Sequence, residues 1–224
     1  MGKREAKSAL YQQFARVGKG LSNPSRLELL DLLSQGERSV EALASAATIG
    51  TSTASMHLHA LKAAGLVSSR KDGTFIYYRL AGEDVGELLV LLRNVATKHL
   101  AEIDRAAEEY LGENPRSASK TVERADLLKR IKRGEVVVLD VRPSLEYQAG
   151  HIPGALSVPL DELDKFLKKL GSKEELVVYC RGAYCVLAYD AVRALKSKGR
   201  DAYRLQEGML EWRLAGLPVE TGAA

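Results

Sequence analysis

Apolar residues recur at helical spacing through the first half of the chain. Between residues 6 and 21, Leu10, Phe14 and Val17 fall on one face, which predicts an amphipathic helix. A second helix is expected to begin at Pro24 behind the capping residue Asn23, and two short helices follow over 39–47 and 51–64. Two short helices joined by a tight turn are typical of a helix-turn-helix.

The helix expected over 51–64 has an apolar face and a polar face. Ala54, Leu58 and Leu61 share one face and are expected to pack inward. Residues on and beside the other face carry hydroxyl, thioether and imidazole groups that suit base edges and phosphates in a DNA major groove, although an ordinary solvated helix has the same pattern. The predicted DNA-binding residues of this helix are Ser52, Thr53, Ser55, Met56, His57 and His59.

A β-hairpin is expected next. Two strand-like runs, 66–71 and 74–80, flank Asp72-Gly73, and Asp-Gly between such runs is a strong hairpin signal. The hairpin carries Arg70, Lys71 and Arg79, which we expect to contact the phosphate backbone beside the groove.

The whole of residues 20–80 resembles the winged helix-turn-helix of ArsR-type repressors. The resemblance rests on the segments 21–27, 52–58 and 61–67 and on the hairpin, which occur in the family's order. It implies a transcriptional regulator, in the main a repressor, that binds double-stranded operator DNA as a homodimer.

Apolar residues keep helical spacing from Val85 to Tyr110, which predicts one long helix. Too little of the first domain remains to cover its stripe, and by resemblance it would pair with the first helix and with their copies in a second chain. Packing within a single chain is the alternative. A polar break with Gly112 and Pro115 follows. We therefore expect a DNA-binding and dimerisation domain over 1–112, a linker over 113–118 and a second domain over 119–224.

Helical and strand-like patterns alternate in the second half of the chain. Helices are predicted over 122–133, 160–170 and 186–198, and strands over 136–141, 176–179 and 202–205. This alternation predicts an α/β domain with a parallel sheet and helices on both faces, beside a mostly α-helical first domain.

Cys180 stands where one of these strands is expected to end. A short loop and then a helix follow it, so unpaired backbone N–H groups and the positive end of the helix dipole would favour its thiolate. A Cys packed as a small hydrophobe is the alternative, but Gly182, Arg181 and the second thiol of Cys185 favour chemistry.

The loop resembles the active-site loop of rhodanese-type sulfurtransferases, in which the first Cys takes up a sulfane sulfur as a persulfide. The match extends over the segments 139–142, 146–147, 150–155, 207–208 and 211–212, in the family's order. It implies that Cys180 is the nucleophile and that Asp140 and Arg142 support the loop. The backbone amides of the loop would form its cradle, contributed by Arg181, Gly182, Ala183, Tyr184 and Cys185.

The size of the loop separates related chemistries. Cys-based phosphatases need an Arg six positions after the Cys, and this position holds Val186. Many rhodaneses carry an Arg at the last loop position, where this chain has Cys185. The loop therefore lacks a cation that would bind the anionic donor thiosulfate, and a switch between two thiols becomes the favoured interpretation.

Composition and charge indicate the cellular compartment and the kind of partner. The chain of 224 residues carries a net charge of +4, and residues 1–79 hold an excess of five basic residues, which suits an anionic partner such as DNA. Two Cys in one loop, no apolar leader and no long apolar run predict a cytoplasmic protein without a membrane segment or disulfide scaffold. No cofactor is expected.

Metal sensing receives little support from the sequence. The first half contains no Cys, so the thiolate metal site of many ArsR-type repressors is excluded. Asp84, His99 and Glu102 are weak candidates for another site of the family.

Three functions remain open. The first is a regulator that senses sulfane sulfur through a Cys180 persulfide, which Cys185 would resolve as a bridge. The second is a sulfurtransferase enzyme that moves sulfur from thiosulfate or a persulfide to an acceptor thiol, attached to a DNA-binding domain. A metal-responsive repressor is third. Whether the chain is an enzyme stays open at this point.

Overall fold

The computed structural model describes residues 2–115, 121–168 and 174–222. Its contacts divide the chain into two compact units, Met1–Leu91 and Leu92–Ala224. This division falls inside a helix, whereas the sequence predicted a linker over 113–118, of which 116–118 lie outside the described residues. No helix in the described part of the chain is long and apolar enough to cross a membrane.

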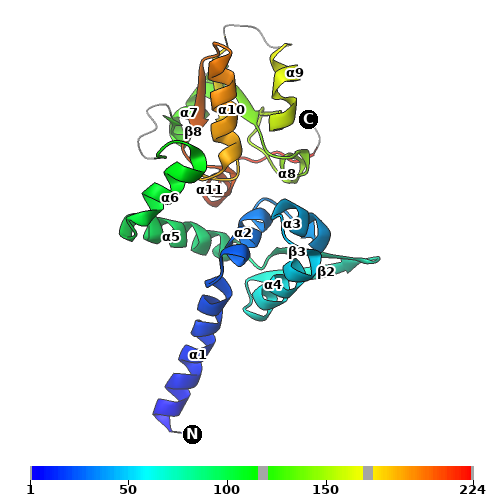
Figure 1. The fold of residues 1–224 in the computed structure, drawn as a ribbon, viewed down its shortest axis with the longest axis vertical. Helices are drawn as coiled ribbons and strands as arrows, with labels where there is room; N and C mark the ends of the chain where they lie inside the picture. The colour runs from blue at the N-terminus through cyan, green and yellow to red at the C-terminus, as the bar shows by residue number, and fades with distance from the viewer. Residues whose placement is uncertain (1, 116–120, 169–173, 223–224) are drawn as a thin grey trace. The chain divides into compact units, whose positions relative to one another are not determined.

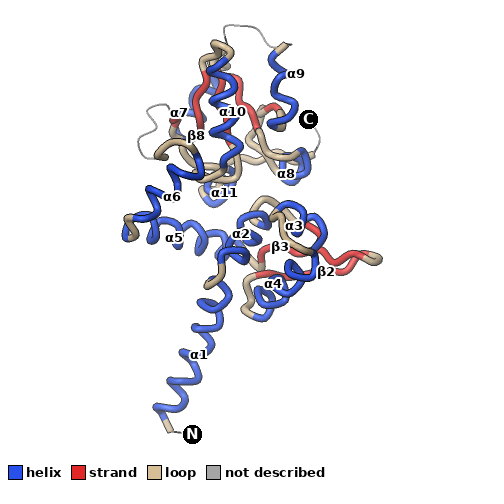
Figure 2. The backbone as a smooth tube through the Cα atoms, in the orientation of Figure 1, coloured by secondary structure: helices blue, strands red, loops and turns tan. Residues whose placement is uncertain are grey.

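The first unit combines helices with a small sheet. Its elements are α1 (Lys3–Leu21), α2 (Pro24–Leu33), β1 (Arg38–Ser39), α3 (Val40–Ala46), α4 (Thr51–Ala63), β2 (Val67–Asp72) and β3 (Phe75–Leu80). The strands are antiparallel in the order β1-β3-β2. Figure 2 shows β2 and β3 in red. The predicted cap of α2 is confirmed, because the Asn23 side chain accepts a hydrogen bond from the backbone N–H of Arg26 at 3.1 Å.

The first unit's core and hairpin agree with the sequence pattern. Ala54, Leu58 and Leu61 of α4 are fully buried and pack with leucines of α2 and α3, as predicted. The hairpin turns at Gly73, which adopts a φ of +58° that favours glycine. Asp72 and Phe75 are the last paired residues before the turn.

The helix predicted from 85 to 110 is two helices, and the prediction of one continuous helix was wrong. They are α5 (Glu83–His99) and α6 (Glu102–Leu111). The break is a tight turn in which the N–H of Ile103 donates to the carbonyl of Leu100 at 3.2 Å. The sequence there lacks Gly and Pro, and the reason for the break is tertiary: Ala107 and Leu111 of α6 bury themselves against Tyr189 in the second domain.

The second domain is built on a parallel sheet of five strands. Along the chain its elements are β4 (Thr121–Val122), α7 (Arg124–Arg133), β5 (Val137–Asp140), α8 (Ser144–Ala149), β6 (Leu156–Ser157), a 3-10 turn (Leu160–Glu162), α9 (Leu163–Leu167), β7 (Leu176–Tyr179), α10 (Val186–Ser197), β8 (Ala202–Leu205) and α11 (Met209–Leu214). The strand order is β4-β8-β7-β5-β6. The helix predicted over 160–170 is thus a turn followed by α9, and residues 169–170 lie outside the described residues.

Helices cover both faces of this sheet, as predicted (Figure 1). Residues of β7 alternate between the faces: Val178 packs with Leu195 of α10, whereas Val177 packs with Leu127 of α7 and Trp212 of α11. The central strand β7 is therefore buried on both sides, and its carboxyl end is held rigidly.

Candidate functional site

The loop between β7 and α10 contains both cysteines of the chain. Cys180 follows the last residue of β7, Cys185 immediately precedes α10, and their sulfur atoms form a disulfide with an S–S distance of 2.08 Å. The sequence left this pairing open. Cys180 is only 1% exposed. The amide of Cys185, one of the predicted cradle groups, donates to the Gly182 carbonyl at 3.1 Å.

Helix α11 holds the first half of the loop. The N–H of Met209, the first residue of α11, donates to the carbonyl of Cys180 at 3.0 Å and so holds the backbone of Cys180. Gly208 approaches the loop so closely that a Cβ there would lie 2.3 Å from the amide nitrogen of Gly182. Only glycine fits this position, although its φ is an ordinary one.

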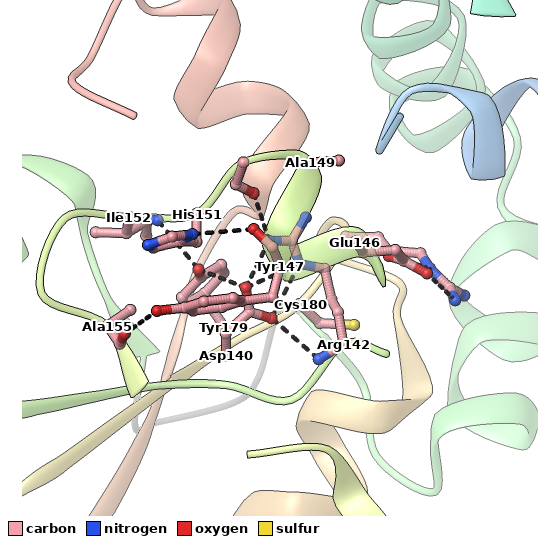
Figure 3. A network of polar contacts seen from close by, with 12 residues as sticks. Asp140, Arg142, Glu146, Tyr147, Ala149, His151, Ile152, Ala155, Tyr179 and Cys180 are labelled. Atoms are coloured by element: carbon pink, nitrogen blue, oxygen red, sulfur yellow. Dashed lines mark hydrogen bonds and ion pairs between the residues drawn. The ribbon is translucent and has the colours of Figure 1, made fainter. Parts of the chain in front are cut away.

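Beneath the loop, Asp140 and Arg142 form a fully buried ion pair (Figure 3). The guanidinium Nε of Arg142 donates to both carboxylate oxygens at 2.9 and 3.1 Å, and its Nη2 donates to the Gly150 carbonyl at 2.8 Å. The hydroxyl of Tyr179, the residue before Cys180, donates to the Asp140 carboxylate at 2.6 Å and accepts from the N–H of Ile152 at 3.1 Å. The pair thus adjoins the end of β7; its predicted role in supporting the loop stays a prediction.

Burial governs the protonation of this network. Burial raises the pKa of Tyr179 well above its ordinary value, and the charge of Asp140 raises it further, so the phenol stays a hydrogen-bond donor. Burial also acts to lower the pKa of Arg142, but the hydrogen bonds and charge of Asp140 outweigh it and hold that pKa above its ordinary value.

The cations around the loop are paired with carboxylates. Arg181, which follows Cys180, donates from Nε to both oxygens of Glu146 at 3.0 and 3.1 Å and from Nη2 at 2.6 Å. The side chain of Glu146 is 1% exposed and that of Arg181 20%. Arg93 of α5 lies 3.8 Å from the carboxylate of Glu211. Arg181 and Arg93 thus each lie beside a carboxylate.

The second half of the loop contacts α5 and α6. The hydroxyl of Tyr184 is hydrogen-bonded to the hydroxyl of Thr97 at 2.9 Å. A Cβ on Gly182 would lie 3.3 Å from the Arg93 guanidinium. Tyr184 also packs into a small cluster with Leu111 of α6 and Tyr189 of α10. The segment between the cysteines is therefore in direct contact with the carboxyl-terminal half of α5.

On α4, most predicted DNA-binding residues are accessible. Ser52, Thr53, Met56 and His59 are exposed and Ser55 is half-buried, so a groove contact by these five stays a prediction. The expected exposure of His57 was wrong, since it is buried at 8% exposure. His57 lies three residues after Ala54 and four before Leu61, so it shares the helix face of these two fully buried residues.

The three basic residues of the β2–β3 hairpin are exposed, and two of them have polar partners. Arg70 forms ion pairs with Glu37 at 2.7 Å and Asp72 at 2.9 Å and lies over the Tyr77 ring. Hydrogen bonds to Glu37 and then to Asp72 raise the pKa of Arg70. Nε of Arg79 donates to the Ser68 hydroxyl at 3.2 Å. Lys71 is exposed, and the phosphate contacts expected of all three cations stay predictions.

The weak metal candidates are not brought together. Among the described residues, no group of three or more His, Cys, Asp or Glu side chains is arranged to hold a metal ion. Asp84, His99 and Glu102 are all described and hence form no such group.

Sequence reasoning missed several residues around the loop. Glu146 and Gly208 belonged to segments that resembled a known family, but neither position received a role. Thr97 and Arg93 carried no signal at all, because they are about 90 residues from the loop in sequence and meet it only in the folded chain.

Comparisons with known proteins match both halves of the chain. Residues 23–69 match the family model of bacterial regulatory proteins of the arsR family, and residues 123–215 match the rhodanese-like domain. The chain is 54% identical over 222 residues to the HTH-type transcriptional regulator Rv0324 of Mycobacterium tuberculosis, which covers 99% of this chain and 96% of that protein. It is 37% identical over 94 residues to the transcriptional regulator Rv0081 of the same species, covering 42% of this chain and 82% of that one.

A solved structure resembles the first half. It is the solution NMR structure of the homodimeric winged helix-turn-helix DNA-binding domain Mb0332 from Mycobacterium bovis, 53% identical, covering 46% of this chain and 94% of that chain with a TM-score of 0.42. The full-length similarity to a transcriptional regulator and the two family matches together settle the class of protein. The chain belongs to the arsR family of bacterial regulatory proteins, as a DNA-binding transcriptional regulator with a rhodanese-like domain at its carboxyl-terminal side.

Proposed function

We propose that the protein is a repressor that senses sulfane sulfur through Cys180 and Cys185 and binds its operator as a homodimer. The observation that carries the proposal is the pairing of the two thiols in a loop that also contacts α5. A loop that only carried sulfur for catalysis would need one thiol, and the second sits within bonding distance of the first.

The chemistry follows from the two thiols. In the reduced loop, the N-terminus of α10 beside Cys185 favours the thiolate forms of the two cysteines. The Cys180 thiolate attacks the terminal sulfur of a persulfide, the S–S bond of the donor breaks, and the donor leaves as a thiol. The Cys185 thiolate then attacks Sγ of Cys180 and expels the sulfane sulfur as hydrogen sulfide. One persulfide and two thiols thus give a disulfide, one thiol and one sulfide, and cellular thiols restore the reduced loop by exchange.

Contacts of the loop supply a route to the DNA-binding unit. Bridging Cys180 to Cys185 constrains the residues between them, including Tyr184, whose hydroxyl bonds to Thr97 of α5. Toward its other end the same helix buries Val85 and Leu89 in the core that also holds Leu58 of α4. We therefore expect the state of the loop to bias the position of α5 and, through it, the helix that reads DNA.

Exposed apolar side chains support the dimer. Leu10, Tyr11 and Phe14 of α1 are each more than half exposed, as is Leu91 of α5. Exposed apolar residues on α1 and α5 favour burial against a second copy of the chain, which would read a two-fold symmetric operator.

The test uses the full chain and a DNA duplex selected from a random pool by the reduced protein. Treatment with a persulfide donor should release one sulfide per chain and change the DNA affinity at fixed salt at least tenfold, about 1.4 kcal/mol. Cys180→Ser should abolish both effects, and Cys185→Ser should retain a persulfide without releasing sulfide. Unchanged DNA affinity in the bridged protein would overturn the proposal.

The sulfurtransferase alternative makes a different prediction in the same experiment. An enzyme of ordinary speed would turn over at roughly 1 per second or more with an acceptor thiol present. A sensor would consume one donor per chain and then stop until it is reduced. Continuous turnover without any change in DNA affinity would identify the protein as an enzyme attached to a DNA-binding unit.

A further inference from the structure

The charges around the loop define the kind of sulfur donor that it can accept. Arg181 is the cation nearest to the nucleophile in sequence, and an unpaired guanidinium there would attract a dianion such as thiosulfate. Glu146 instead holds it through three hydrogen bonds of 2.6 to 3.1 Å. Because the Glu146 side chain is almost fully buried, its negative charge is screened little by solvent and opposes an approaching anion.

Two neighbouring arginines are paired with carboxylates as well. Arg93, which faces Gly182, pairs with Glu211. Arg142, below the loop, pairs with Asp140. Each of these three arginines is therefore paired with a carboxylate. A fourth arginine, Arg213, donates to the backbone carbonyls of Ala149 and Gly150.

A cavity borders the same end of the sheet. It has a volume of about 540 Å³ and is lined by Val141, after β5, and by Leu187, in the first turn of α10. Both side chains pack in the apolar cluster that contains Cys180. Asp161 and Glu162 are the charged residues among the described lining, which contains no Lys or Arg. The described lining is thus apolar and negatively charged, and Val141 and Leu187 join it to the apolar cluster around Cys180.

We propose that the loop accepts sulfur from a small organic persulfide that carries at most one negative charge, and that Glu146 sets this preference by neutralising Arg181. The inference rests on the proposed persulfide chemistry of Cys180 and names its donor class. With thiosulfate the Cys180 thiolate would attack the outer sulfur and sulfite would leave, so two negative charges would have to sit beside the buried Glu146. With an organic persulfide the leaving group is a single thiolate.

The test measures how fast one sulfur atom is added to Cys180, by mass spectrometry of the reduced full chain. The Cys185→Ser background prevents resolution, so the persulfide accumulates. Two probes are compared: thiosulfate and cysteamine persulfide, whose ammonium group balances its charge. Adding Glu146→Gln should raise the thiosulfate rate at least tenfold while the cysteamine persulfide rate changes less than about threefold. Because both probes meet both proteins, their intrinsic reactivities cancel from this comparison.

Glu175→Gln is the matched control. Glu175 also pairs with an arginine, Arg130, but lies before the first residue of β7, at the opposite end of the strand from the loop. This variant should leave both rates unchanged. If Glu146→Gln fails to fold, as judged by Trp212 fluorescence, the salt dependence of the Cys185→Ser protein decides. A neutral loop predicts a thiosulfate rate that does not fall with added salt, whereas a steep fall would reveal an effective cation and overturn the inference.

Two failures are distinguishable. If cysteamine persulfide adds sulfur to Cys180 but Glu146→Gln leaves the ratio of the two rates unchanged, the donor class is wrong and the proposed sensing chemistry stands. If neither probe adds sulfur to Cys180, the proposed function itself fails, and the donor class with it.

Discussion

The buried pair beneath the loop gives a sharp prediction for the variant Asp140→Asn. The substitution keeps the shape of the side chain but removes its charge, which leaves the fully buried Arg142 guanidinium without its countercharge. The Asp140 carboxylate also accepts from the Arg142 backbone N–H at 3.0 Å and from the Tyr179 hydroxyl at 2.6 Å. Breaking a buried pair on one side costs about 3–5 kcal/mol, a large part of the roughly 5–15 kcal/mol by which a domain is stable.

The chain offers a clean probe for this loss. Its single tryptophan, Trp212, is fully buried in the core of the second domain, so its fluorescence reports the unfolding of that domain alone. At a urea dependence of about 2 kcal/mol per molar, the unfolding midpoint should fall by about 2 M. Asp126→Asn, which breaks an exposed ion pair of 3.9 Å with Arg130, should lower the free energy of unfolding by less than about 1 kcal/mol. Equal losses in the free energy of unfolding for the two variants would refute the view that the Asp140–Arg142 pair supports the loop.

Two further predictions concern the strand end and its neighbour. Gly208→Ala would place a Cβ 2.3 Å from the Gly182 amide nitrogen, so the loop must shift; we expect sulfur uptake by Cys180 to fall at least tenfold, measured by mass spectrometry, and an unchanged rate would contradict the close packing. Tyr179 has a pKa raised above its ordinary value of 10.0, so the folded domain holds a proton that the unfolded chain releases, and stability should fall as the pH rises past about 10. Tyr179→Phe should make that fall shallower in urea titrations followed by Trp212 fluorescence, and an identical slope in both proteins would argue against a buried, protonated phenol.

Most of the fold could be predicted from long periodic segments and from capping and turn residues. The caps at Asn23 and Pro24, the inward face of α4 and the run that forms β7 were predictable, because each is decided by residues within a few positions of one another. The short elements β4, β6, α8 and α11 were not, since two to six residues give no measurable period.

The break between α5 and α6 marks the limit of sequence reasoning about the site. Nothing local distinguishes Leu100 or Ala101 from their neighbours, and the turn exists because α6 packs on Tyr189 of the second domain. Thr97, shortly before that turn, contacts Tyr184 through a hydrogen bond that joins residues far apart in sequence. Cys180, the predicted nucleophile, and the second thiol were therefore visible in the sequence, whereas their pairing with each other and the ion pair of Arg181 with Glu146 required the fold.

The most direct measurement compares the DNA affinity of the bridged and reduced protein in the full chain and in Tyr184→Phe, at one fixed salt concentration. The variant removes only the hydroxyl that bonds to Thr97 at 2.9 Å and leaves both thiols in place. If the loop controls DNA binding through α5, the two states of the unmodified chain differ at least tenfold, and the difference shrinks by about threefold or more in Tyr184→Phe. Equal affinities of the bridged and reduced unmodified chain would contradict the control of DNA binding by this thiol pair.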